Sequence, residues 1–170
     1  MKKMLLYGTA LTLALSLMGC SIKGNNDAAL GESKNQIEEQ VHKENSEEEV
    51  ITNLVKDFGS KLKLVSLLAP KDTLEKEIKE NYSEFVSEKL IEKWLSDPEN
   101  APGRLTSSPW PDRIEVEDIE KVSENEYKVE GKVIEVTSDK KDGDISREIT
   151  LNIKLIDTKW IIDEVVLGEY

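Results

Sequence analysis

Cysteine and histidine are almost missing from this 170-residue sequence, which has one of each, Cys20 and His42. A single cysteine excludes a disulfide within the chain. Neither residue type occurs after position 42. A domain folded from the later residues therefore lacks Ser–His and Cys–His nucleophilic systems and the common acid–base schemes that use histidine.

Positive charge is scarce as well. The chain has 23 Lys and Arg residues against 35 Asp and Glu residues, a formal net charge of −12. Nucleic-acid binding needs a basic surface that neutralises phosphates, and this composition does not supply one. Direct electrostatic attachment to anionic lipid is disfavoured for the same reason. We therefore predict no nucleic-acid partner.

Motifs for phosphate and metal binding are also missing. No glycine-rich loop ends in Gly-Lys-Ser or Gly-Lys-Thr, the sequence that would hold nucleotide phosphates. A turn around Gly143 contains three aspartates, Asp139, Asp142 and Asp144. If it were an EF-hand loop aligned on that glycine, three of its ligand positions would be Ser138, Lys140 and Ile149. We interpret the segment as an acidic turn and predict no metal and no cofactor.

The N-terminus has the pattern of a secretion signal. Lys2 and Lys3 form a short basic start, and the stretch from Met4 to Met18 is uncharged and almost entirely apolar or small. As a helix these residues would rise about 22 Å, less than the roughly 30 Å of a bilayer core. We predict a signal peptide over residues 1–19 that is removed, rather than a permanent membrane span.

The residues that close this stretch, Leu17-Met18-Gly19-Cys20, resemble the bacterial lipobox. The resemblance implies that Cys20 receives a diacylglycerol before cleavage and that further acylation, such as palmitate, completes the anchor. Two or more acyl chains give lasting attachment to a membrane. A free or buried thiol is the alternative. We therefore predict a lipoprotein held at Cys20 on the extracytoplasmic face of the cell membrane.

Residues 20–46 are predicted to form a lipidated and disordered tether. The segment is rich in Asn, Gln, Gly and acidic residues and has only scattered aliphatic ones, too few to order it. His42 lies within it, where an exposed imidazole is expected rather than a metal ligand or a base. Cleavage before Cys20 would remove Lys2 and Lys3 and no acid, taking the net charge from −12 to −14.

Helices are predicted at the start of the folded domain, residues 47–170. Ser46 and the acidic run after it suit a helix start. Apolar residues at helical spacing follow, and Pro70 is expected to end this helix. They are Val50, Ile51, Leu54, Val55, Phe58, Leu62, Val65 and Leu68.

A second helical stretch is expected to begin at Asp72 and Thr73 and to end at Asp97-Pro98. Whether it breaks near Ser83 is left open. Its apolar residues recur at helical spacing, and among them Trp94 is predicted to be a core residue.

The segment from Pro98 to Pro111 is rich in Pro, Gly and Ser and predicts irregular structure. Within it Trp110 stands between two prolines, with Arg104 and Arg113 on either side. A stiff aromatic flanked by arginines in an acidic protein suits a ligand or partner contact. The alternative is that Trp110 folds back over the open end of the fold while Arg113 pairs with a neighbouring acid.

Four β-strands are predicted after this segment. Alternating Ile- and Val-rich runs occupy Arg113–Val122, Glu126–Thr137, Ile145–Asp157 and Lys159–Leu167. The short turns between the first two strands and between the last two predict antiparallel hairpins, and so a meander. In the second strand the apolar parity shifts, which predicts a bulge between Gly131 and Ile134. Trp160 is predicted to lie in the core.

Helices followed by a bent antiparallel meander that ends in Lys159-Trp160-Ile161-Ile162-Asp163 resemble the NTF2-like α+β cone. Gram-positive surface lipoproteins with such domains are common, and this chain resembles them. A cystatin-like fold is the second choice. The resemblance implies a conical pocket that some members use for small hydrophobic molecules, whereas others make protein contacts through the outer face of the sheet.

Two functions from different classes are compatible with the sequence. The favoured one is a non-catalytic binding or protein-interaction module that engages an envelope protein or a small hydrophobic ligand near the membrane. The alternative is a hydrolase or isomerase that uses a buried carboxylate in the cone. No catalytic residue is nominated, because the acids are abundant and their distribution singles out no pair.

Overall fold

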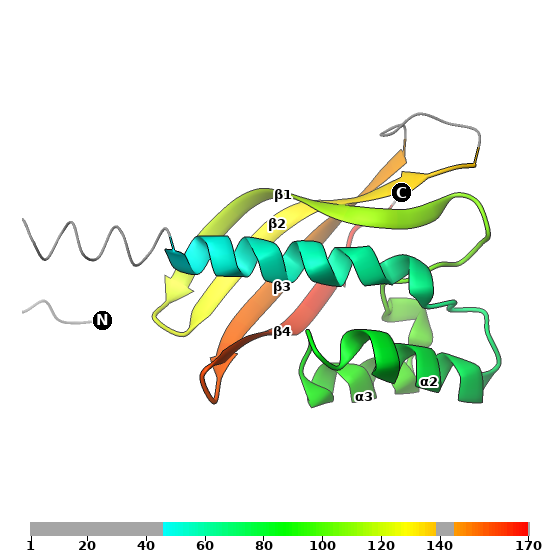
Figure 1. Cartoon of the computed structure of the whole chain (residues 1–170), viewed down its shortest axis with the longest axis horizontal. Helices are drawn as coiled ribbons and strands as arrows, with labels where there is room; N and C mark the ends of the chain where they lie inside the picture. Colours follow the sequence, from blue (N-terminus) through cyan, green and yellow to red (C-terminus); the bar gives the residue numbers. More distant parts are fainter. Residues whose placement is uncertain (1–45, 139–144, 170) are drawn as a thin grey trace, which may run out of the picture. The chain divides into compact units, whose positions relative to one another are not determined.

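Helices come first and an antiparallel sheet follows in the computed structural model, which describes residues 46–138 and 145–169 (Figure 1). The described residues all belong to one compact unit. The predicted signal peptide, Cys20, residues 20–45 of the predicted tether with His42, and the aspartates of the acidic turn lie outside the described residues. The last residue of the predicted tether, Ser46, already belongs to the first helix.

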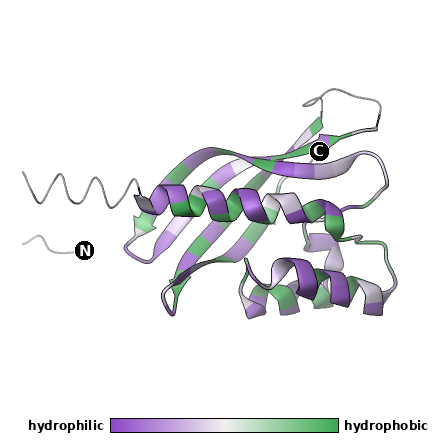
Figure 2. Cartoon of the chain, in the orientation of Figure 1, coloured by the Kyte–Doolittle hydropathy of each residue, from purple (hydrophilic) through white to green (hydrophobic). Residues whose placement is uncertain are grey.

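The first helix is described from residue 46 to residue 61. Hydrophobic residues recur along it among hydrophilic ones, as the bands of the ribbon show (Figure 2). Those at the helical spacing that the sequence predicts form its buried apolar stripe: Ile51, Val55, Phe58 and the following Leu62, all fully buried. This helix covers the sheet, and its stripe packs with residues of the sheet in one core.

The predicted end of this helix at Pro70 is wrong by several residues. After residue 61 the backbone tightens into the 3₁₀ turn η1 (Leu62–Leu64). Val65 and Leu67 then bond to the backbone of Arg104, with Arg104 N–H to Val65 C=O at 2.8 Å and Leu67 N–H to Arg104 C=O at 2.9 Å. This non-local pairing replaces the last helical turns and leaves Leu68 75% exposed.

The second helical stretch divides in two. Helix α2 (Lys71–Tyr82) begins directly after Pro70, and helix α3 (Glu88–Ser96) begins after Ser87, whose hydroxyl accepts from the Leu90 N–H at 3.3 Å. The cap at Ser87 satisfies an otherwise unpaired donor of the first turn. Helix α3 ends before Asp97-Pro98 as predicted, and the 3₁₀ turn η2 (Pro98–Asn100) follows.

The four strands form one sheet in the order β1-β2-β3-β4, an antiparallel meander. They are β1 (Trp110–Ser123), β2 (Glu126–Val136), β3 (Ile145–Ile156) and β4 (Lys159–Leu167). The predicted α+β class and the meander are therefore confirmed. Strand β1 begins three residues earlier than predicted, because Trp110 already pairs with Val136.

The predicted bulge in β2 is wrong. Strand β2 pairs with β3 in unbroken register from Glu126 to Glu135, so β2 has no extra residue on that side. The irregularities lie on β1 instead, at three places where it pairs with β2: between Pro111 and Arg113, Val116 and Asp118, and Lys121 and Ser123. Bulges on an edge strand bend the sheet and hinder pairing with another chain.

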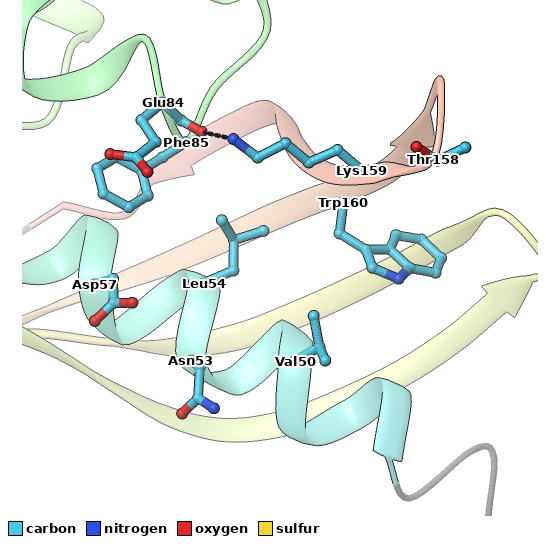
Figure 3. Close-up of a pocket in the computed structure, with 9 residues that line it drawn as sticks. All are labelled: Val50, Asn53, Leu54, Asp57, Glu84, Phe85, Thr158, Lys159 and Trp160. Atoms are coloured by element: carbon cyan, nitrogen blue, oxygen red, sulfur yellow. Dashed lines mark hydrogen bonds between the residues drawn. The ribbon is translucent and has the colours of Figure 1, made fainter.

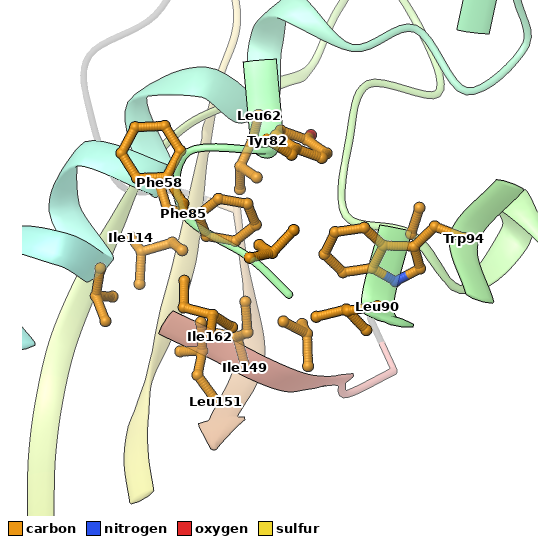
Figure 4. Close-up of a cluster of buried hydrophobic side chains, with 14 of the residues drawn as sticks. Phe58, Leu62, Tyr82, Phe85, Leu90, Trp94, Ile114, Ile149, Leu151 and Ile162 are labelled. Carbon is orange, nitrogen blue, oxygen red and sulfur yellow. The ribbon is translucent and has the colours of Figure 1, made fainter. Parts of the chain in front are cut away.

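The core fills the space between the helices and the inner face of the sheet (Figure 4). Phe58 stacks on Trp94 with ring centroids 6.4 Å apart, and Tyr82 meets both rings edge-on. The Tyr82 hydroxyl donates to the Pro102 carbonyl at 2.7 Å. Trp94 is fully buried, as the sequence predicts. On the sheet side, inner-face residues such as Tyr127, Val129 and Leu151 are fully buried, so side chains fill this layer.

Candidate functional site

A groove of about 430 Å³ runs beside the first helix, between it and the start of β4 (Figure 3). Its walls come from three parts of the fold: the helix, the link between α2 and α3, and the turn from β3 into β4. A cavity of this volume lies within the range of small-ligand sites. The residues that line it are Val50, Asn53, Leu54, Asp57, Glu84, Phe85, Thr158, Lys159 and Trp160.

The helix wall is a second stripe, distinct from the buried one. Val50, Asn53, Leu54 and Asp57 follow the i, i+3, i+4, i+7 spacing that places side chains on one helix face. Leu54 is half-buried and packs against the core, whereas Val50 is 51% exposed. The apolar stripe of this helix is therefore wider than the core requires, and its outer edge faces the groove.

The opposite wall is held by two hydrogen bonds between backbone groups and one from a side chain. The Ile162 N–H donates to the Phe85 carbonyl at 2.9 Å, and the Ser87 N–H donates to the Ile162 carbonyl at 2.9 Å. The Lys159 ammonium donates to the Glu84 carbonyl at 2.7 Å, drawn as a dashed line in Figure 3. These three bonds fix the link between α2 and α3 alongside β4, so the groove is formed before any ligand arrives.

Trp160 closes one end of the groove. Its ring meets Tyr127 edge-on with centroids 5.1 Å apart, and the Tyr127 hydroxyl donates to the Glu47 carboxylate at 3.0 Å. Trp160 was predicted as a core residue, and this is only partly right: the ring packs against the core but remains half-buried. Trp160, the second residue of β4, also lines the groove.

The chemistry of the groove suits binding. Its floor is apolar, from Leu54, Phe85 and Trp160, and its polar groups are amide, hydroxyl, ammonium and carboxylate. Its carboxylates, those of Asp57 and Glu84, belong to exposed residues. No lining residue is a Cys, His or Ser nucleophile or base. Such a site can hold an apolar body and orient it with a few polar contacts.

The structure separates the contact residues that the sequence nominates. Trp110 and Arg113 both lie on β1, opposite Val136 and Ile134 respectively, which places the two side chains on the outer face of the sheet. Arg104 lies in the preceding loop, where its backbone bridges to the segment after η1. The three residues do not line one cavity, and Arg113 forms ion pairs with Asp112 at 3.4 Å and Glu115 at 2.8 Å.

Trp110 does not plug the fold. It is half-buried and does not belong to the hydrophobic core or to the residues packed against it. Arg113 pairs with the neighbouring acids Asp112 and Glu115, which is the alternative that the sequence left open for this residue. A contact role for Trp110 stays a prediction, on the outer face of the sheet rather than at a mouth of the cone.

One carboxylate in the described part of the chain is buried. Glu135 on β2 is 7% exposed and has interaction partners within the fold. It lines a separate cavity of about 350 Å³ with residues of the loop before β1 and Ile145. This is the type of residue that the predicted alternative, catalysis by a buried carboxylate, requires.

The outer face of the sheet carries alternating charges. Lys128 pairs with Glu130 at 2.6 Å, and Lys154 pairs with Asp163 at 3.0 Å. The hydrogen bond that Lys128 donates to Glu130 is the main cause that raises the pKa of Lys128 above its ordinary value. Charge is depleted at the cores of stable protein interfaces, so this central part of the face suits contact with water.

Within residues 46–138 and 145–169, no three His, Cys, Asp or Glu residues are grouped so that they could hold a metal ion. The helices of the same ranges are all too short or too polar to cross a bilayer.

No protein-family model matches the sequence, and no curated protein matches it either. Among solved structures, the chain is similar to a protein of unknown function from Bacteroides thetaiotaomicron VPI-5482. The TM-score is 0.42 with 11% identity, covering 79% of this chain and 98% of that one. It is also similar to an NTF2-like protein involved in plasmid conjugation. There the TM-score is 0.39 with 15% identity, covering 69% of this chain and 47% of that one.

The second similarity gives the observed α+β fold an NTF2-like structural neighbour. Both TM-scores are below 0.5, and neither neighbour's family nor its activity is carried over to this chain. The NTF2-like family therefore remains a prediction, whereas helices followed by a four-stranded antiparallel sheet are observed.

Sequence reasoning missed the groove. Its nine lining residues come from three separate segments. The local sequence pattern of one segment does not predict that the other two lie beside it. One signal was present: Val50 and Leu54 lie beside the stripe of Ile51, Val55 and Phe58. An apolar face wider than one core contact needs can mark a second contact surface.

Proposed function

We propose that this chain is an exported lipoprotein, anchored through Cys20 on the extracytoplasmic face of the cell membrane, whose folded domain is a non-catalytic binding module of NTF2-like type. The basic start, the uncharged apolar stretch and the lipobox-like Leu17-Met18-Gly19-Cys20 support the anchor. The groove beside the first helix supports the binding role.

The observation that carries the binding role is the preformed apolar groove. Phe85 and Trp160 contribute aromatic surface from opposite ends, and Leu54 lies between them on the helix wall (Figure 3). Burying apolar ligand surface here contributes about 25 cal/mol for each Å² removed from water. A small hydrophobic ligand of the envelope is therefore the favoured class, and an envelope protein that inserts one apolar side chain would use the same surface.

A neutral dye tests the groove directly. Nile red fluoresces when it enters an apolar site, and we expect it to bind the domain in the micromolar range. Val50→Glu places a charge on the helix wall at a position that is 51% exposed, so the fold tolerates it. We expect this variant to weaken dye binding at least about fivefold, because a carboxylate costs free energy when it is dehydrated.

Val166→Glu is the matched control. Val166 is 55% exposed but lies on β4 away from the groove, so the same substitution at a similar exposure should leave dye binding unchanged. Trp110→Ala provides a second comparison on the outer face. Equal losses in the Val50 and Val166 variants, or loss of binding only in the Trp110 variant, would exclude the groove as the binding site.

Glu135 favours a second candidate function. A hydrolase or isomerase with a carboxylate base would use this buried residue in its cavity beside the loop before β1. Hydrolysis of a nitrophenyl ester above the buffer rate, abolished by Glu135→Gln in a folded variant, would establish this function. Equal rates for both proteins and buffer would remove the ester-hydrolase form of this candidate.

A further inference from the structure

We infer that the groove selects amphiphiles whose head is an organic cation, so that an alkylammonium binds there in preference to a neutral or anionic molecule of the same length. This names the ligand class of the groove and rests on the binding role proposed above. Three observations lead to it. The groove has two different ends, one end is acidic, and the Lys159 ammonium already donates a hydrogen bond to a backbone carbonyl.

The two ends can be located from contacts on either side. At one end, Trp160 packs against Tyr127, whose hydroxyl bonds to Glu47 near the described start of the first helix. At the other end, the Phe85 ring lies 6.3 Å from the ring of Phe58. Phe58 is about three helical turns further along the first helix than Glu47. The groove therefore runs parallel to the helix, with Trp160 at one end and Phe85 at the other (Figure 3).

The helix wall changes character along this direction. Val50 is at the Trp160 end, and Asp57 lies seven residues further, about 10 Å along the helix axis. Glu84 directly precedes Phe85, so both carboxylates belong to the Phe85 end. A chain of about eight carbons spans such a distance when extended. An apolar tail against Val50 and Trp160 would thus place its head between Asp57 and Glu84.

The charge at the Phe85 end favours a cation. Asp57 and Glu84 are exposed residues, and no ion pair within the described part of the chain neutralises either carboxylate. Lys159 is the cationic residue among those lining the groove, and its ammonium donates to the Glu84 carbonyl at 2.7 Å. Counting all three side chains, the lining has a net charge of −1, and a bound cation would neutralise it.

The charge of the whole chain acts in the same direction. The formal net charge of −12 raises the concentration of cations around the molecule and lowers that of anions. Screening limits this effect to about 10 Å at 0.1 M salt, so the preference should be largest at low ionic strength. An anionic head would find one cationic partner in the lining, Lys159, whose ammonium already uses one of its three N–H donors on the Glu84 carbonyl, and it would lie near the carboxylates of Asp57 and Glu84.

Three probes of equal chain length separate the head group from the tail. Octylammonium, octanol and octanoate would be titrated at pH 7 and low salt, following the indole N–H resonance of Trp160 by NMR. The sequence has three tryptophans, and a Trp160→Phe spectrum assigns the signal. We expect octylammonium to bind about three- to tenfold more tightly than octanol, and octanoate more weakly than both.

Charge variants complete the test. Asp57→Asn with Glu84→Gln should remove the preference, so that octylammonium and octanol bind this variant with equal affinity. Glu92→Gln removes one exposed acid of α3 outside the groove and should preserve the preference. Equal affinities for octylammonium and octanol, or tighter binding of octanoate, would overturn the cation preference and leave the binding role intact. No shift of Trp160 with any probe would overturn both.

Discussion

Single residues link the two helices of the α2–α3 hairpin to the rest of the fold. Tyr82 is the clearest case. Its ring packs within the aromatic core, and its hydroxyl donates a hydrogen bond to the Pro102 carbonyl. Burial raises the pKa of Tyr82 well above its ordinary value, and the charge of Glu77 adds to the effect. The neutral phenol is therefore the form that the fold requires.

Tyr82→Phe should lower the free energy of unfolding by about 1–3 kcal/mol at pH 7, because the Pro102 carbonyl loses its donor. Since the phenol stays protonated in the folded state, the unfolded state alone ionises near pH 10, and wild-type stability falls above that pH. Urea unfolding of both proteins at pH 7 and pH 10.5 should show the difference shrinking at the higher pH. Equal stability at pH 7 would contradict this role.

Asp163 has the opposite pH dependence. The hydrogen bond from Lys154 is the main cause that lowers the pKa of its carboxyl, and a hydrogen bond from Ser87 adds to it, against the effect of burial. A lowered pKa means that ionised Asp163 stabilises the fold above about pH 4, and that this contribution is lost as the pH falls through the lowered value.

Asp163→Asn should therefore cost about 1 kcal/mol at pH 7 and progressively less in acid. Chemical unfolding at pH 7, 4 and 3 measures this difference. The exposed neighbour Glu164 provides the control, since Glu164→Gln should change stability by less than about 0.5 kcal/mol. A difference between wild type and Asp163→Asn that stays constant down to pH 3 would contradict the assignment.

At the scale of helices and strands, the first helix lies close against β1 at Gly59. A Cβ atom added there would lie 2.6 Å from the Ile114 nitrogen, which is backbone and cannot move aside cheaply. The glycine thus sets how near the helix lies to the sheet. This helix also forms one wall of the groove, so its position determines the width of the groove.

Gly59→Ala tests this contact, because two effects compete. Alanine favours a helix by about 1 kcal/mol over glycine, whereas overpacking costs about 1–3 kcal/mol. We expect the clash to dominate and the variant to lose about 1–2 kcal/mol in thermal unfolding, whereas Ser60→Ala at the adjacent exposed position should stay within about 0.5 kcal/mol. A more stable Gly59→Ala protein would show that the helix can move away without cost.

The strands were predicted well, because alternation and tight turns are local signals. The last strand, Lys159–Leu167, matches its predicted bounds, and Asp157 and Thr158 take the positive φ angles of a tight hairpin turn. The end of the first helix was not predictable in the same way. Val65 continues the helical spacing, but its backbone bonds to Arg104, 39 positions later in the sequence.

The bulge was assigned to the wrong strand for a related reason. The shift of apolar parity in β2 is real, since Val133, Ile134 and Glu135 are all buried. Burial on both faces of that end explains it, however, and the extra residues lie on the neighbouring strand β1. A single strand's pattern reports burial and does not identify which partner strand is irregular.

At the scale of the whole molecule, the location of the protein is a prediction from its N-terminal sequence, whereas the proposed binding role rests on the fold. The groove depends on three segments that come together only in the folded state. Composition and residue spacing could therefore exclude classes of catalytic site, but they could not predict the groove. The net charge of the chain also acts at this scale, because it attracts cationic ligands and repels anionic ones before they touch the protein.

The proposed anchor predicts a definite chemical form of the mature protein. When the full chain is expressed in a bacterium, mass spectrometry should find residues 1–19 removed and acyl chains on Cys20. Cys20→Ser should abolish the acylation, because serine lacks the sulfur that forms the thioether. An unmodified thiol at Cys20, or a chain recovered from cytosol with its first nineteen residues intact, would contradict the anchored location.

Intermolecular nuclear Overhauser effects between the domain and octanol test the central claim most directly, because they identify the protons that touch the ligand. Octanol is neutral, so the result does not depend on the head-group preference. Binding in the groove predicts contacts from the octanol chain to the Val50 and Leu54 methyl groups and to the Trp160 ring. Contacts confined to Trp110, or to the loop beside Glu135, would place the ligand elsewhere and contradict the account.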